Sequence, residues 1–336
     1  MKTLIKWLAR LFLLAVLVIG GIAVYGYQQW QALEKMTVAT TEEPLFVVAR
    51  GETTFHLINR LTDEPVPALT RKLWLRFHPE LAAVRQGTYK FDADTRLRSA
   101  LMSMVNGDVY RLQVTLIEGL RLSDWQQRLA GAEYLDVTLD ENATEAEIAN
   151  QLGLSSDKLE GRLLPETYSY TPGDTDLSIL LRAHEEMERF LEKAWAERRP
   201  NLPIATPDEA LILASIIEKE TGIAEERPLI ASVFVNRLRV GMRLQTDPTV
   251  IYGMGEDYDG NIRKKDLQTH TPYNTYMIDG LPPGPIAMPS KEAITAALQP
   301  VDSNYYYFVA MGEGRHYFSK SLREHNNAVR RYILKR

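Results

Sequence analysis

Glu218 is the residue of this chain whose type and setting best suit acid–base chemistry. It lies in the sequence IIEKE, residues 216–220. At helical spacing it follows Ala214 and Ser215 by one turn, so its carboxyl group would emerge from an apolar stripe near a helix C-terminus. Apolar surroundings and the negative end of the helix dipole both favour the protonated form. A carboxylic acid that stays protonated near neutral pH can act as a general acid.

An ion pair is the alternative for Glu218, and the pattern alone ranks it first, because buried glutamates are more often paired than catalytic. Arg227 and Arg237 are the candidate partners. Glu220 would lie on another face of the same helix. The two glutamates are therefore not expected to serve one small site together.

The helix that would carry these glutamates has clear start and stop signals. Thr206 suits the N-cap, Pro207 the first helical position and Glu209 the acidic position of a capping box, and Gly222 ends the helix. Apolar residues between these ends would surround the whole cylinder, which indicates a helix buried on most sides. They are Ala210, Leu211, Ile212, Leu213, Ala214, Ile216 and Ile217.

A second helix is predicted from Glu225 to Gly241, and a long irregular stretch follows it. That stretch includes residues 243–250, a polar run at 253–279 and a proline-rich segment at 281–289. Such a stretch inside a compact domain usually forms a binding wall. Its amide, acidic and aromatic side chains are of the types that bind sugars. The candidate substrate-binding residues are Gln245, Asp247, Tyr252, Asn274 and Tyr276.

The N-terminus predicts a membrane anchor. Residues 11–27 are an uninterrupted apolar run, preceded by basic residues and ending in aromatic ones. We therefore expect a cytoplasmic N-terminus at 1–10, a transmembrane anchor at 11–30 and a polar tether at 31–44. A cleaved signal peptide is the alternative, but no small-x-small cleavage site follows the run. The rest of the 336-residue chain would then lie outside the cytoplasmic membrane.

Composition excludes several classes of function. The net charge is −5 and no basic cluster lies beyond the N-terminus, which argues against nucleic acid as a partner. The chain has no cysteine, so disulfides, thiol catalysis and cysteine metal sites are excluded. Six dispersed histidines form no metal-binding motif, and we expect neither a metal nor a cofactor.

The fold class expected for the remainder is α+β. Residues 46–61 and 114–129 share a weak repeat of strand, glycine and helix, and this order resembles the start of a LysM module, a small glycan-binding unit. A small LysM-like α+β domain is expected at 45–111, followed by a larger α+β catalytic domain at 112–336. The catalytic domain would end in a helix near 291–298, a hairpin of strands 305–310 and 316–318, and a helix from Leu322.

Long motifs in this order resemble the endolytic murein transglycosylases, the YceG-like group. They are ASIIEKET at 214–221, VFVNRL at 233–238, LQTDPTVIYG at 244–253, YNTY at 273–276 and GLPPGPI at 280–286, followed by HYF at 316–318 and EHN at 324–326. The resemblance covers nearly the whole chain. Two departures are visible: Glu166 stands where the family more often has Asp, and Ser290 where Gly is usual.

The resemblance implies that Glu218 is the catalytic acid/base. The reaction would cut the β-1,4 bond between N-acetylmuramic acid and N-acetylglucosamine inside nascent peptidoglycan strands and leave 1,6-anhydro ends. One carboxyl group suffices there, because the muramic acid 6-hydroxyl attacks its own anomeric carbon. The resemblance also implies an inner-membrane protein with a periplasmic catalytic domain, which works beside peptidoglycan synthases and ends strand elongation.

Two rival functions stay open. A muramidase-type hydrolase would need a second carboxylate, and Asp247 or Glu166 could supply it. A membrane-tethered glycan-binding adaptor would have no catalysis, and its Glu218 would only be salt-bridged.

Overall fold

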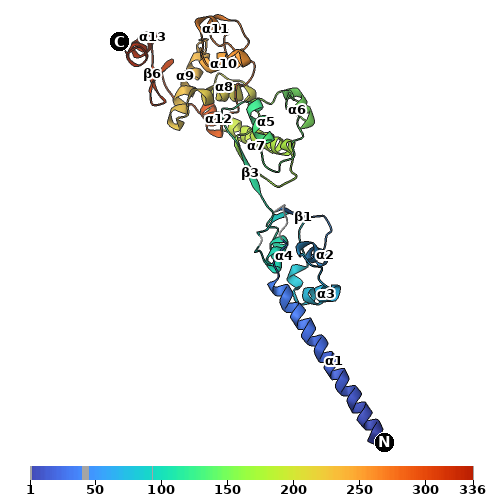
Figure 1. Cartoon of the computed structure of the whole chain (residues 1–336). Coiled ribbons are helices and arrows are strands. Elements are labelled where there is room, and N and C mark those ends of the chain that lie inside the picture. The colour runs from blue at the N-terminus through green and yellow to red at the C-terminus, as the bar shows by residue number, and fades with distance from the viewer. Residues whose placement is uncertain (1, 40–44, 93, 336) are drawn as a thin grey trace. The chain divides into compact units, whose positions relative to one another are not determined.

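The computed structural model describes residues 2–39, 45–92 and 94–335, and the chain divides into two compact units, Met1–Arg111 and Leu112–Arg336. Both units mix helices with two-stranded antiparallel sheets, so the expected α+β class is confirmed (Figure 1). Part of the predicted tether, residues 40–44, lies outside the described residues.

The first unit begins with one long helix, α1 (Lys2–Lys35). Its segment Leu4–Lys35 is long and apolar enough to cross a membrane by length and composition. The helix ends later than the predicted anchor, so the first residues of the predicted tether, 31–35, are helical. The physical reason is tertiary: Leu33 is buried in the core of this unit.

A small α+β layer follows α1 in the first unit. Its elements are β1 (Leu45–Val48), α2 (Thr54–Leu61), α3 (Ala68–Phe77), η1 (Pro79–Leu81), β2 (Gly87–Lys90) and α4 (Leu97–Asn106). Strand β1 pairs with β2 in antiparallel register, and the core centres on Trp74, Tyr89 and the leucines of α2 and α4. The LysM-like character of this unit stays a prediction.

The second unit opens with a strand, glycine and helix in the same order as β1, Gly51 and α2. Here β3 (Leu112–Leu116) leads through Gly119 to α5 (Leu122–Ala130), and both glycines have left-handed φ, 82° and 71°. Only glycine adopts this conformation without strain, so each turn depends on it. Strand β3 pairs with β4 (Glu166–Tyr170), and α6 (Glu145–Gln151) and α7 (Asp176–Ala196) complete this half.

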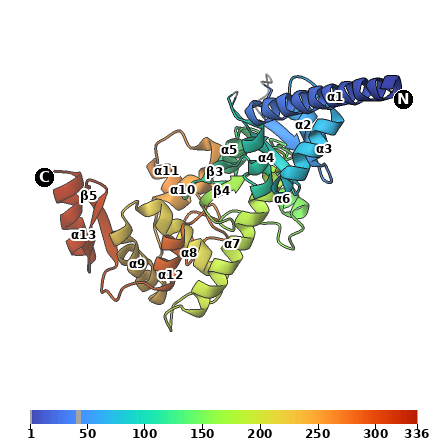
Figure 2. The same cartoon turned by 90° about the horizontal axis from the view of Figure 1, so that it is seen from below.

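Helix α8 (Pro207–Glu220) is central to the second unit. Thr206 caps it through a hydrogen bond from the Glu209 N–H, and every residue of 210–217 is buried, which confirms the predicted helix start and the burial on most sides. It packs against α7, α9 (Arg227–Arg239), α10 (Asp247–Met254) and α12 (Lys291–Leu298), as Figure 2 shows for α7, α9 and α12.

The stretch after α9 is less irregular than the sequence suggests. Helix α10 begins at Asp247, with Pro248 in its first turn, and α11 (Lys264–Gln268) follows after η3 (Gly255–Asp257). We expected loop here because prolines and glycines crowd the segment, but Pro is tolerated at a helix N-terminus. The C-terminal part is a hairpin of β5 (Tyr307–Gly312) and β6 (Arg315–Ser319), then α13 (Leu322–Ala328) and the π-helical turn Val329–Ile333.

Candidate active site

The carboxylate of Glu218 is enclosed by donors. Its Oε1 accepts a hydrogen bond from Arg227 Nη2 at 3.2 Å, and its Oε2 accepts from the backbone N–H of Ser290 at 2.9 Å and from the Ser290 hydroxyl. The Glu218 side chain is only 4% exposed and that of Arg227 12%. The ion pair that the pattern ranks first is therefore present, with Arg227 as the partner.

These contacts hold the Glu218 side chain in one position, and its catalytic role stays a prediction. All three groups donate to the carboxylate oxygens, and the positive charge of Arg227 strengthens the hydrogen bond that it makes. Ser290 lies 72 positions further along the chain and reaches Glu218 because α12 packs against α8. The sequence singled it out only as a departure from the family pattern. The arrangement ties three helices together: α8, α9 and the N-terminus of α12.

Glu220 faces a different environment, an open cleft. The hydroxyl of Thr246 donates a hydrogen bond to Glu220 Oε1. Burial raises the pKa of Glu220 to about 7, although the hydrogen bond from Thr246 acts in the opposite direction. The neighbouring charge of Asp247 also raises this pKa, while His316 and Arg237 lower it. A carboxyl group that titrates near neutral pH can both donate and accept a proton in one catalytic cycle.

The cleft beside Glu220 has a volume of about 520 Å³. One wall comes from α8 and the loop into α10, the other from the C-terminal hairpin and α13. The lining residues are Glu220, Arg237, Leu244, Gln245, Thr246, Asp247, Tyr276, Tyr307, Phe308, Val309, Ala310, His316, Leu322, His325 and Val329. Three of the five predicted binding residues are thus brought together: Gln245, Asp247 and Tyr276.

The polar side chains of this cleft are held in place. Tyr276 donates its phenolic hydrogen to Asp247 Oδ1 at 2.6 Å, and burial together with this bond raises the pKa of Tyr276. Arg237, the other partner proposed for Glu218, instead donates to the carbonyl oxygens of Tyr306 and Leu244 at 2.6 and 2.7 Å. The buried guanidinium of Arg237 therefore connects the backbone just before β5 with the backbone of the loop before α10.

Tyr252 and Asn274 do not line this cleft, although all five residues were expected to form one wall near Glu218. The other three line a cleft to which Glu220 contributes and Glu218 does not. Tyr252 packs against Tyr273 with ring centroids 4.7 Å apart and lines a separate cavity of about 190 Å³. Asn274 is buried, and its Nδ2 donates to the carbonyl oxygen of Thr269 at 2.6 Å. It stabilises the loop after α11. Asp247 and Tyr252 are close in sequence but do not line the same cleft, because both lie on α10 and their side chains leave different faces of that helix.

Three further residues of the cleft have side chains that could take part in chemistry, and none of them is among the predicted site residues. Glu220 was placed correctly on another face of the helix from Glu218 but not considered further. His316 contacts Glu226 Oε2 through Nδ1 at 2.8 Å. Burial lowers the pKa of His325, whose ring stacks on Tyr307. Both histidines lie in the late motifs HYF and EHN, so the motifs could have indicated that the C-terminus completes the site.

A metal site was not expected. Within residues 2–39, 45–92 and 94–335, no group of three or more His, Asp or Glu side chains is arranged to hold a metal ion.

Known proteins are similar to this chain over most of its length. The model of the YceG-like family matches residues 46–331. This chain belongs to the YceG-like family. The YceG-like chain is 30% identical to the endolytic murein transglycosylase of Bacillus subtilis, over 94% of its own length and 91% of that protein.

Two further comparisons agree with this assignment. The endolytic murein transglycosylase of Streptococcus pneumoniae is 34% identical to the YceG-like chain over 182 residues, which are 52% of this chain and 32% of that protein. A 2.6 Å crystal structure of a yceG-like protein of Listeria monocytogenes matches with a TM-score of 0.53 and 28% identity, and the match covers 86% of this chain and 99% of that one.

Proposed function

We propose that this protein is a membrane-anchored endolytic lytic transglycosylase that cuts the β-1,4 bond between N-acetylmuramic acid and N-acetylglucosamine in nascent peptidoglycan strands. We further propose that Glu220, rather than Glu218, is its acid/base. Membership of the YceG-like family supports the transglycosylase activity on peptidoglycan. The observation that carries the choice of residue is that Glu220 lines the cleft, where burial raises its pKa to about 7.

One carboxyl group is enough for this reaction. In the first half, protonated Glu220 gives its proton to the glycosidic oxygen as the bond from that oxygen to the anomeric carbon breaks. The muramic acid 6-hydroxyl then attacks the anomeric carbon, and the Glu220 carboxylate takes the hydroxyl proton. The products are a free 4-hydroxyl on N-acetylglucosamine and a 1,6-anhydro end, and Glu220 is protonated again.

The cleft offers groups that would hold the sugars. Gln245 and Asp247 are exposed at the N-terminal end of α10, and Tyr276 presents a ring beside them. We propose these three as substrate-binding residues. Alanine at any of them should weaken glycan binding, and a variant with unchanged turnover and affinity would remove that residue from the set.

Helix α1 supports a single-pass anchor with the N-terminus in the cytoplasm, because basic residues precede the apolar run and none follows it directly. The second unit would then act in the periplasm. The family resemblance also suggests that the enzyme works beside peptidoglycan synthases and ends strand elongation, and a site next to the membrane, where new strands emerge, would suit that role. Longer glycan strands in cells that lack the protein would support this role.

A hydrolase is the second candidate, because Asp247 lines the same cleft as Glu220. The other carboxylate considered, Glu166, instead pairs with Lys291 at 3.0 Å, outside the cleft. Mass spectrometry of the products separates the two reactions, since a hydrolase leaves reducing ends and a lytic transglycosylase leaves anhydro ends.

The deciding experiment incubates the purified full chain with uncrosslinked glycan strands. Anhydro ends with the wild type and none with Glu220→Gln would support the proposal. Glu218→Gln is the matched control on the same helix, and it should retain activity wherever it is folded. Loss of activity in folded Glu218→Gln with activity kept in Glu220→Gln would return the role to Glu218. Unchanged strand lengths with the wild type would favour the non-enzymatic adaptor.

A further inference from the structure

Helix α3 exposes an apolar stripe on the first unit. Leu69, Leu73 and Phe77 follow one another at intervals of four residues and are 70%, 47% and 67% exposed. The opposite face of the helix is buried through Trp74 and Arg71. Large side chains aligned in this way on an exposed face indicate a contact with an apolar partner.

The stripe is continuous with the aromatic end of α1. The rings of Trp30 and Phe77 meet edge to face with centroids 5.1 Å apart. Between the two helices lies an open, mostly apolar crevice of about 430 Å³. Its lining residues are Ile22, Ala23, Tyr25, Gly26, Tyr27, Trp30, Leu69, Thr70, Leu73 and Phe77. The exposed face of α3 therefore extends the surface of the helix that could cross a membrane.

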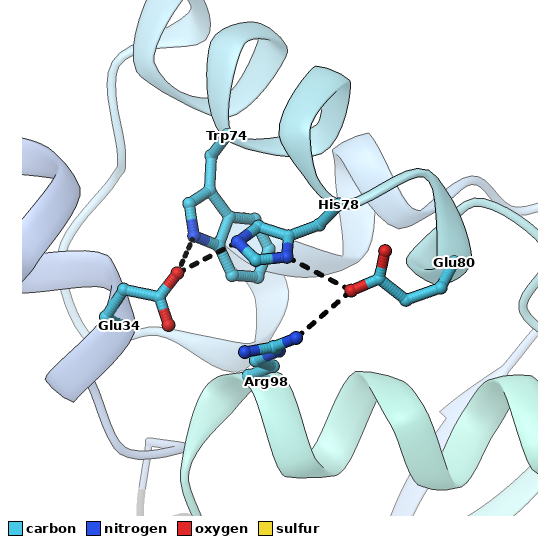
Figure 3. Close-up of polar contacts among 5 residues, drawn as sticks. All are labelled: Glu34, Trp74, His78, Glu80 and Arg98. Atoms are coloured by element: carbon cyan, nitrogen blue, oxygen red, sulfur yellow. Dashed lines mark hydrogen bonds and ion pairs between the residues drawn. The ribbon is translucent and has the colours of Figure 1, made fainter.

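A polar cluster fixes α3 to the end of α1 (Figure 3). Glu34 Oε1 accepts a hydrogen bond from Trp74 Nε1 at 3.0 Å and contacts His78 Nε2 at 2.9 Å. The other ring nitrogen of His78 contacts Glu80 at 3.1 Å, and Glu80 in turn accepts from Arg98 of α4 at 3.2 Å. Because side chains of α1, α3 and α4 meet here, the apolar stripe of α3 is held at a fixed height, that is, a fixed position along the axis of α1.

That height coincides with the edge of a bilayer. The uncharged apolar run at residues 11–27 rises about 25 Å, close to the thickness of a hydrocarbon core. Tyr25, Tyr27 and Trp30 then lie at the membrane–water boundary, where such rings are enriched. The crevice begins at Ile22, slightly deeper than these aromatic residues.

Charge on α3 indicates the chemistry of the surface that it would contact. Lys72 and Arg76 are exposed and flank the stripe, and the helix contains no acidic residue. A helix with an apolar face and adjacent basic residues is suited to the interface of an anionic bilayer, where its cations meet phosphate groups.

We propose that α3 is a second membrane contact: it lies in the headgroup region of the outer face of the membrane, with its stripe and the crevice covered by lipid chains and with Lys72 and Arg76 at lipid phosphates. This inference depends on the proposed anchoring through α1. It gives α3 the function of holding the first unit flat against the bilayer.

The absence of cysteine from the chain allows single labels at chosen positions. The full chain is placed in nanodiscs of phosphatidylglycerol and phosphatidylcholine, with an environment-sensitive fluorophore on Leu73→Cys, Ile19→Cys or Ser99→Cys. Ile19 lies within the apolar run of α1, and Ser99 is exposed on α4. Water-soluble iodide and lipids carrying a shallow spin label serve as two quenchers.

The expected result is a blue-shifted emission at Leu73→Cys that spin-labelled lipid quenches and iodide quenches several-fold less than at Ser99→Cys. Iodide quenching at Leu73→Cys equal to that at Ser99→Cys would overturn the inference. Protection from iodide without quenching by lipid would also overturn it, because a protein would then cover the stripe. The label at Ile19→Cys reports separately on α1, so a failure of the proposed anchor is distinguished from a failure at α3.

A charge test accompanies the label at Leu73→Cys. Lys72→Glu with Arg76→Glu should reduce lipid quenching, and more in phosphatidylglycerol than in phosphatidylcholine alone. Arg50→Glu with Lys90→Glu is the matched control, since it makes the same change in net charge at exposed positions beside and on the β1–β2 sheet. Equal quenching in the two double variants would exclude the proposed phosphate contacts and overturn the proposal as stated.

Discussion

Glu218 and Glu220 lie two residues apart on α8, and their carboxylates meet opposite environments: Glu218 is bound by Arg227 and Ser290, whereas Glu220 opens into the cleft beside Thr246. A separation of two residues turns a helix by about 200°, so the two side chains leave nearly opposite faces. In the proposed mechanism, this short motif supplies one carboxylate for structure and one for chemistry.

Removal of the arginine partner of Glu218 should destabilise the second unit. Arg227→Met leaves a buried carboxylate without its cation, and we expect the free energy of unfolding to fall by about 3–5 kcal/mol. Glu218→Gln combined with Arg227→Met should be more stable than Arg227→Met alone, since no unpaired charge remains. Urea unfolding of the three variants measures this, and equal stability of the single and double variants would contradict the structural role of the pair.

The activity should fall as the pH rises through about 7. In the proposed mechanism the acid form of Glu220 starts the reaction, and half of that form would be lost at its raised pKa of about 7. Release of anhydro products at saturating and limiting glycan, measured from pH 5 to pH 9, gives the profile. A rate that stayed constant between pH 6 and pH 8 would contradict this assignment.

Thr246→Val should shift the fall in activity, which we expect near pH 7, to higher pH. Thr246 donates to the Glu220 carboxylate and so lowers its pKa; without the hydroxyl, burial acts unopposed by this bond. Thr246 caps no helix through its side chain, so the variant should keep the fold. A fall in activity at an unchanged pH in a folded, active variant would show that Glu220 is not the titrating acid.

Glu160 should make the protein less stable at alkaline pH. Its Oε2 accepts from the Leu122 N–H at 3.3 Å, its Oε1 is buried without a partner among the described residues, and burial raises its pKa from 4.5 to about 8. Glu160 therefore binds its proton more tightly in the folded state than in the unfolded state. The stability gained in this way is complete below pH 4.5 and is lost as the pH rises from 4.5 through 8.

Glu160→Gln should remove this loss. At pH 9 we expect it to unfold with a free energy about 2–4 kcal/mol higher than the wild type, and at pH 5 with a much smaller difference. Glu188→Gln, an exposed glutamate on α7, is the control. A gain that is the same at pH 5 and pH 9 would exclude a titrating Glu160 as its cause.

Gly161 should not tolerate a side chain, whereas Gly153 should tolerate one at modest cost. Both have left-handed φ, 76° and 72°, but a Cβ at Gly161 would lie 2.3 Å from Pro285 Cβ, and one at Gly153 would meet nothing within 4 Å. We expect Gly153→Ala to cost about 1 kcal/mol of strain and Gly161→Ala at least about 2 kcal/mol more. Thermal unfolding of both variants measures the difference, and equal melting temperatures would contradict the close approach.

Several features of this protein could be read from residues close together in sequence. The ends and burial of α8 follow from Thr206, Pro207 and a continuous apolar run, because capping and hydrophobic contacts are local signals. The apolar run of α1, the α+β class and the family resemblance also depend only on pattern. The pairing of Glu218 with Arg227 was foreseen as an alternative for the same reason, since α9 follows α8 after a short turn.

The tertiary structure decided which glutamate meets the cleft. Periodicity shows that Glu218 and Glu220 point different ways, but not which of them meets the cleft. That depends on α12, which brings Ser290 to one face, and on the hairpin and α13, which bound the cleft on the other. The tertiary structure also separated the five predicted binding residues. Gln245, Asp247 and Tyr276 line the cleft, whereas α10 directs Tyr252 away from it and Asn274 is buried in the loop after α11. Long-range packing sets these positions, and no local sequence signal encodes it.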